Sequence, residues 1–271
     1  MLTTRTIATS QGAVTYLEAG QGAPLVLLHG IGSAARSFSA QMAAFADRRV
    51  IAWNAPGYAG SAPLAPAAPD AGDYACALGA FLDALGVADC DLFGHSLGCL
   101  MAARFAADHP QRVASLTLAS IAAGHARLEP QERARLLDGR LGDVAALGPR
   151  GMAEKRGPRL LGPDASPDQI RAVVETMACV DPDGYGQAAR MLSSGDILAD
   201  LARLPASIPV RIVFGSADVI TPPEVNRRVA AAFGRAEVVE IPRAGHALYV
   251  DQSGAFNAAL AASLRRNDER G

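Results

Sequence analysis

Residues 90–107, which read CDLFGHSLGCLMAARFAA, change from a strand pattern to a helix pattern at one serine. The apolar run before Gly94 suits a buried strand, whereas the residues after Gly98 suit a helix that is apolar nearly all round. Because glycine has no Cβ, Gly94 and Gly98 let strand and helix meet in a turn too crowded for larger residues. Ser96 is then expected at the strand's carboxyl end, above the free N–H groups of the helix, where it could act as a nucleophile.

The same pattern has a simpler interpretation. A Gly-x-Ser-x-Gly spacing also arises by chance in a chain with 27 glycines, where it would mark only a tight turn. The strand pattern before Ser96 and the helix pattern after it favour the nucleophile, because that turn needs this context. The remaining chain must then supply a base, an acid and donors for a negatively charged oxygen.

The composition predicts a soluble protein with a large core. The length of 271 residues, 50% of them hydrophobic, suits one α/β domain with an insertion. A net charge of -2 provides no basic field for nucleic acid. The four cysteines form no Cys-x-x-Cys pair, so no metal site or disulfide framework is predicted, and no cofactor is expected. Residues 1–10 lack an apolar signal region and no stretch reaches membrane-spanning length, which predicts a cytoplasmic protein without a membrane partner.

Strand and helix patterns alternate along most of the chain. Strands are predicted at 6–8, 14–18, 25–28, 49–53, 92–93, 113–118, 210–214 and 237–241. Helices are predicted at 34–46, 73–85, 224–233 and 254–265, besides the one after Gly98. This alternation indicates an α/β fold with a mostly parallel central sheet flanked by helices.

The alternation stops between residues 122 and 205, where no good strand candidate appears. Helices are expected near 129–137, 143–146, 166–177 and from 184 to about 200. Ser166 followed three residues later by Gln169 has the spacing of a capping box. We therefore expect a core of residues 1–121 and 206–271 and a helical cap of residues 122–205, here called the helical insertion.

Polar loops follow several of the expected parallel strands. The carboxyl ends of such strands share one edge, so the loops at 29–33, 94–98, 215–221 and 242–249 should converge there. His246 is the candidate base that would activate Ser96, and Asp218 is the candidate carboxylate that would orient its imidazole. The chain order Ser96, Asp218, His246 is the one expected for such a turn.

Other residues could fill these roles. The remaining histidines are interpreted as structural; they are His29, His95, His109 and His125. His29 is expected to shape the loop behind the site. Asp251 is the alternative acid, but it follows His246 so closely that we expect it to cap the last helix instead.

Acyl transfer also needs donors for the negative oxygen that forms during the reaction. The N–H of Leu97, directly after the nucleophile, is one expected donor, and the N–H of Ile31 is the other. The alternative is that residues 29–33 form only a glycine turn. Their expected position opposite Ser96 argues against it.

Five motifs together resemble the α/β-hydrolase superfamily over essentially the whole chain. They are HGIG at 29–32, APGYAGS at 55–61, GHSLG at 94–98, GSAD at 215–218 with TPP at 221–223, and AGH at 244–246. Within that superfamily, GYGQAAR at 184–190, followed by Asp196 and the 221–223 loop, is most similar to the 3-oxoadipate enol-lactonase branch of carboxylic-ester hydrolases. The resemblance implies ester or lactone hydrolysis more than it implies that metabolite.

Two positions depart from the relatives. Many relatives carry an aspartate where this chain has Asn54, a change that touches no catalytic role. Relatives that hydrolyse C–C bonds often have a tryptophan soon after the histidine, whereas His246 is followed by Ala247, Leu248 and Tyr249. This difference disfavours C–C hydrolysis.

The leading hypothesis is a cofactor-free serine hydrolase that acts on a small carboxylic ester or lactone through an acyl-enzyme. The alternatives are a C–C bond hydrolase of ring-cleavage products, or a non-hydrolytic oxygenase or ligand-binding protein that needs no cofactor. Substrate contacts are predicted at Gly30, His95, Arg190 and Met191. Arg190 is a candidate carboxylate anchor, or else a solvated arginine of the cap. A small-molecule substrate is the expected partner, and a homodimer is compatible with the sequence.

Overall fold

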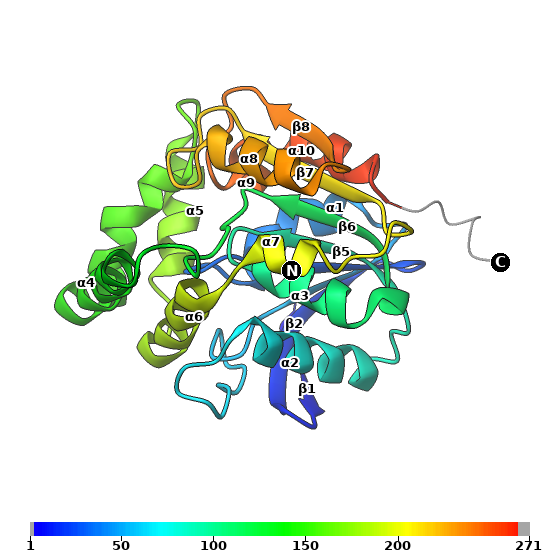
Figure 1. Cartoon of the computed structure of the whole chain (residues 1–271), viewed down its shortest axis with the longest axis horizontal. Coiled ribbons are helices and arrows are strands. Elements are labelled where there is room, and N and C mark those ends of the chain that lie inside the picture. The colour runs from blue at the N-terminus through cyan, green and yellow to red at the C-terminus, as the bar shows by residue number, and fades with distance from the viewer. Residues whose placement is uncertain (1–2, 265–271) are drawn as a thin grey trace.

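The computed structural model describes residues 3–264. An eight-stranded sheet forms its centre, with strand order β1-β2-β4-β3-β5-β6-β7-β8 (Figure 1). The strands are β1 Arg5–Thr9, β2 Gly12–Ala19, β3 Pro24–Leu28, β4 Arg49–Trp53, β5 Cys90–His95, β6 Val113–Ala119, β7 Val210–Gly215 and β8 Glu237–Ile241. β2 pairs antiparallel with β1 and β4, and the pairings from β4 across to β8 are parallel. The predicted α/β class with a mostly parallel sheet is confirmed.

Helices cover both faces of the sheet. They are η1 Ala35–Phe38, α1 Ser39–Ala44, α2 Ala71–Ala84, α3 Gly98–Asp108, η2 Pro110–Arg112, α4 Pro130–Arg156, η3 Gly157–Leu160, α5 Pro167–Met177, α6 Pro182–Ser194, α7 Ile197–Leu201, α8 Pro223–Phe233, α9 Leu248–Asp251 and α10 Ser253–Ala261. Residues of α2, α3 and α8 belong to one core cluster, and residues of α1, α9 and α10 belong to another.

The strand β3 shows why helices must cover both faces of the sheet. Side chains of a strand alternate between the two faces of a sheet. Val26 and Leu28 accordingly pack in the first cluster, whereas Leu25 and Leu27 pack in the second. All four are completely buried, as a continuous apolar run in a parallel sheet requires.

The helical insertion lies between β6 and β7 and carries α4 to α7. In Figure 1, α4, α5 and α6 lie to one side of the sheet. The capping box predicted at the start of α5 is confirmed, because the Ser166 side chain accepts from the Gln169 N–H and the Gln169 side chain accepts from the Ser166 N–H. The inserted region is therefore helical, as expected.

Some helix boundaries differ from those expected. The helices expected near 129–137 and 143–146 are parts of α4, which kinks at Gly148 (φ 63°, ψ 172°) because Pro149 follows. The helix expected from 184 to about 200 is divided into α6 and α7, and Asp196 caps α7 by accepting from the Leu198 and Ala199 N–H groups.

The segment expected as one helix at 34–46 is a 3₁₀ turn followed by the short α1. The last helix ends at Ala261, and its expected end at Arg265 lies outside the described residues. Within residues 3–264, no helix has both the length and the apolar character needed to cross a bilayer.

Candidate active site

The turn between β5 and α3 holds Ser96 in a conformation that few non-glycine residues adopt. Its φ is 51°, in the left-handed region, and its N–H donates to the Ala119 carbonyl at 2.9 Å. A Cβ added to Gly94 would lie 2.5 Å from the Gly98 carbonyl oxygen, and one added to Gly98 would lie 2.4 Å from the Leu28 carbonyl oxygen. Both glycines are therefore needed for strand, turn and helix to pack this closely.

Asp218 and His246 meet at the carboxyl edge of the sheet, after β7 and β8 respectively. Asp218 Oδ2 lies 2.9 Å from His246 Nδ1. Asp218 Oδ1 accepts from the N–H groups of Ile220 (2.8 Å) and Thr221 (2.9 Å), and the Thr221 hydroxyl donates to Oδ2 at 2.9 Å. The carboxylate is thus held by several donors besides the histidine.

These contacts keep the Asp218 carboxyl ionised. Burial by itself raises the pKa of this carboxyl, but the neighbouring His246 and the N–H donors outweigh burial and lower the pKa to about 2. An ionised Asp218 accepts a hydrogen bond from the protonated Nδ1 of His246. The other ring nitrogen, Nε2, is then unprotonated and can act as a base. The role of Thr221 as a third partner was not predicted; only its place in the 221–223 motif pointed to it.

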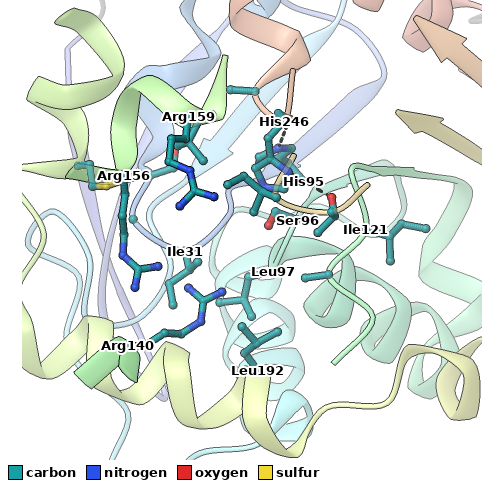
Figure 2. A pocket seen from close by; sticks show the side chains of 18 of the residues that line it. Ile31, His95, Ser96, Leu97, Ile121, Arg140, Arg156, Arg159, Leu192 and His246 are labelled. Atoms are coloured by element: carbon teal, nitrogen blue, oxygen red, sulfur yellow. Dashed lines mark hydrogen bonds between the residues drawn. The ribbon is translucent and has the colours of Figure 1, made fainter. Parts of the chain in front are cut away.

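Ser96 and His246 line one cavity of about 320 Å³. Figure 2 shows them close together on the same wall, with the Ser96 hydroxyl turned toward the cavity. The structure therefore brings together the serine, histidine and aspartate that the sequence singled out.

Ile31 and Leu97 line the same cavity as Ser96. Neither of their N–H groups donates to another group within residues 3–264, so both are available to a bound oxygen. Gly30 permits this approach, because a Cβ there would lie 2.9 Å from the Ser96 Cβ. Gly30, predicted as a substrate contact, packs against the nucleophile residue instead.

His95 lines the cavity wall, but its ring is held by contacts within the protein. Its Nε2 lies 2.9 Å from the His246 carbonyl oxygen, and its ring packs on the rings of His246 and Tyr249 at centroid distances of 4.8 and 4.7 Å. Burial, together with the nearby His246, lowers the pKa of His95 to about 3, so the ring is neutral and donates from Nε2. His95 thus supports the loop of His246.

Asp251 does not cap the last helix, contrary to the expectation. Its Oδ2 accepts from the N–H groups of Gly162 (2.5 Å) and Gly245 (2.8 Å). Gly245 precedes His246, and Gly162 belongs to the helical insertion. Asp251 therefore joins the insertion to the loop of the candidate base, a link between residues distant in sequence that its position alone did not indicate.

Arg190 and Met191 do not reach the cavity, contrary to their predicted role as substrate contacts. Met191 is completely buried in the first core cluster, and Arg190 lies along its own helix, 3.0 Å from where a Cβ on Gly186 would be. Arg140, Arg156, Arg159 and Arg228 line the cavity instead. In the sequence, nothing distinguishes these arginines from solvated ones.

Sequence comparison places the chain among proteins of this architecture. A family model described as the alpha/beta hydrolase fold matches residues 23–253. RutD of Variovorax paradoxus, named provisionally as a carbamate hydrolase, is 32% identical over 258 residues, which cover 90% of this chain and 92% of RutD. The pimeloyl-acyl-carrier-protein methyl ester esterase of Chromobacterium violaceum is 30% identical over 254 residues, which cover 90% of this chain and 95% of that enzyme.

Solved structures show the same likeness. A thermophilic esterase from Thermogutta terrifontis, solved with malate bound, has a TM-score of 0.84 and 26% identity, covering 96% of this chain and 97% of the esterase. An enol-lactonase from Burkholderia xenovorans has a TM-score of 0.85 at 20% identity, covering 95% and 98% of the two chains. At 20% identity, the similarity to the enol-lactonase shows a shared fold and nothing about activity.

Proposed function

Because the chain belongs to the α/β-hydrolase fold family, we propose that it is a cofactor-free serine hydrolase that cleaves a small carboxylic ester or lactone. One observation carries the proposal: a buried Asp218–His246 pair, 2.9 Å apart, lies beside a serine held at positive φ on the wall of a cavity. A serine hydroxyl is a weak nucleophile and needs an oriented base. This arrangement provides one.

The proposed reaction has two halves. His246 takes the proton of Ser96, and the serine oxygen attacks the substrate carbonyl carbon, while the N–H groups of Ile31 and Leu97 stabilise the oxyanion. The carbonyl reforms as the bond to the leaving oxygen breaks, and His246 returns the proton to that oxygen. Water, deprotonated by His246, then attacks the acyl-enzyme and releases the acid and free Ser96.

Carbamates are a second candidate class of substrate. The relative with 32% identity is named provisionally for carbamate hydrolysis, and a carbamate carbonyl can be attacked by the same serine. A relative from Pseudomonas with 24% identity is named as a 2-hydroxy-6-oxononadienedioate hydrolase, so C–C substrates belong in the same comparison.

The test compares wild type with Ser96→Ala on a panel of p-nitrophenyl esters, small lactones, carbamates and dienoic keto acids. We expect ester or lactone turnover that falls by about a millionfold in kcat in the variant, as removal of a triad nucleophile does elsewhere. Ser194→Ala, at an exposed position of α6, is the matched control and should retain full activity.

Labelling gives a second readout of the nucleophile. A serine-directed fluorophosphonate should modify wild type and Ser194→Ala at Ser96 and leave Ser96→Ala unmodified. Folded wild type that neither turns over the panel nor becomes labelled would overturn the proposal. Turnover of keto acids well above that of esters would replace it with C–C hydrolysis.

A further inference from the structure

The cavity carries a cationic cluster that the reaction at Ser96 does not use. We propose that Arg140, Arg156 and Arg159 of the helical insertion bind a carboxylate of the substrate, so that the enzyme acts on esters or lactones that bear a free acid group. This inference rests on the proposed function and adds the substrate class to it.

The charged side chains that line the cavity are all of one sign. Its lining contains the three arginines and Arg228, and no aspartate or glutamate among the described residues. The whole chain has a net charge of -2, so this excess of positive charge is local. Clustered like charges in a cleft raise the local concentration of ions of the opposite sign. An anionic substrate is the ligand that such a cavity favours.

Two of the three arginines form no ion pair within the part of the chain that the structure describes. Arg156 forms a hydrogen-bonded ion pair with Asp143, with Nε 3.1 Å from Oδ2. Arg140, which is half-buried, and Arg159, which is exposed, form no ion pair with any residue between 3 and 264. Other surface arginines do pair with an acid, as Arg243 does with Asp164. The guanidinium groups of Arg140 and Arg159 are therefore free to pair with a ligand.

The arginines come from consecutive elements of the insertion. Arg140 and Arg156 belong to α4 and Arg159 to η3. Figure 2 shows the three guanidinium groups turned toward the cavity and gathered around Ile31, across from Ser96. Since the Ile31 N–H is one proposed oxyanion donor, a substrate whose carbonyl is bound there would extend its other end toward the arginines.

The surface between Ser96 and the arginines is apolar. Ile31, Leu97 and Leu192 form this part of the lining. A short chain of methylene groups fits such a wall, and a planar carboxylate at its end would pair bidentately with a guanidinium group. The expected substrates are therefore half-esters of dicarboxylic acids, or lactones that carry a carboxylate.

The test uses two esters of equal length that differ in charge, monomethyl adipate and the methyl ester of adipic acid monoamide. Wild type should hydrolyse the acid with the higher kcat/KM. Arg140→Gln and Arg159→Gln should each lower kcat/KM for the acid by about tenfold to a hundredfold, the range expected for a hydrogen bond to a charged group. Their kcat/KM for the amide should change little.

Arg190→Gln is the matched control, because this arginine lies in the same insertion but does not line the cavity. It should leave both substrates unaffected, and thermal denaturation should show all variants folded. Equal kcat/KM for acid and amide in wild type would overturn the inference. So would a loss in the arginine variants that is the same for both esters.

Binding separates this inference from the proposed function. Adipate binding to Ser96→Ala, measured by calorimetry, needs no turnover. It should weaken when Arg140→Gln or Arg159→Gln is added and stay unchanged when Arg190→Gln is added. If wild type hydrolyses neither ester but this pattern holds, only the proposed reaction fails. If adipate binds equally with and without the two arginines, the carboxylate anchor fails.

Discussion

His29 shows how one buried side chain can shape the loop behind a site. Its Nε2 accepts from the Ala55 N–H at 3.0 Å, so Nδ1 must carry the proton, and Nδ1 donates to the Gly30 carbonyl at 2.9 Å. Burial lowers the pKa of His29 to about 4, although the bond to Gly30 opposes this change. The neutral ring joins the loop after β4 to the loop that carries Ile31, as its position in sequence suggested.

A pH-dependent stability follows from this residue. In the unfolded chain, histidine titrates near pH 6.5, whereas folded His29 titrates near pH 4. As the pH falls below 6.5, the unfolded state binds a proton that the folded state does not, so the folded state loses stability. We expect His29 to lower the free energy of unfolding by about 2 kcal/mol between pH 7 and pH 5.

The measurement is urea unfolding of wild type and His29→Gln at pH 7, 6 and 5. The variant should lose less stability than wild type as the pH falls, because other titrating groups are common to both proteins. The difference in slope is the readout, whatever the two stabilities are at pH 7. Parallel pH curves for the two proteins would contradict the prediction.

At the scale of elements, the segment that follows His246 is the junction between sheet and insertion. Asp251, at the end of α9, accepts from Gly162 and Gly245. The Ala247 N–H also donates to the Leu160 carbonyl at 2.7 Å, which adds a backbone link across the same junction. The position of the insertion over the cavity and the position of the candidate base are thus mechanically coupled.

Asp251→Ala should loosen this junction. The substitution leaves two partly buried N–H groups without their acceptor, which should lower the free energy of unfolding by roughly 1 to 3 kcal/mol per group. Hydrogen exchange at Gly162 and Gly245 should become faster, and kcat should fall. Asp164→Ala is the control, since Asp164 forms an exposed ion pair with Arg243 and such pairs contribute little. Unchanged exchange at both glycines in Asp251→Ala would refute the coupling.

At the scale of the whole molecule, the helical insertion shares its core with the sheet. Met152, Tyr185 and Met191 of the insertion belong to the same buried cluster as Val26 and Leu92 of the strands. The expected division into a core and a cap at residues 122–205 remains a proposal about organisation. The shared cluster argues that the two parts fold as one unit.

We therefore expect a single unfolding transition. Trp53, the sole tryptophan, is completely buried in β4 and reports on the sheet, whereas far-ultraviolet circular dichroism reports on all helices. The two probes should give coincident urea curves. Met191→Ala should shift both curves together, with a loss of about 2 to 5 kcal/mol for a fully buried methionine. Loss of helical signal before Trp53 is exposed would show that the insertion unfolds independently.

Short-range sequence patterns determined the local structure of much of this protein. The glycines around Ser96, the capping box at Ser166 and the apolar runs of the strands act within a few residues, so they can be read without a structure. The order of strands and loops also placed Asp218 and His246 at one edge, because parallel strands end together. The structure brings those two side chains to hydrogen-bonding distance.

Tertiary structure alone decided which side chains of the insertion face the cavity. The sequence pointed to Arg190 of α6, yet Arg140 of α4 and Arg159 of η3 line the cavity, because packing sets which face of each element is turned inward. The link from Asp251 to Gly162 likewise joins residues 89 positions apart. Such contacts depend on how long-range packing docks one element on another, and no local pattern in the chain records that geometry.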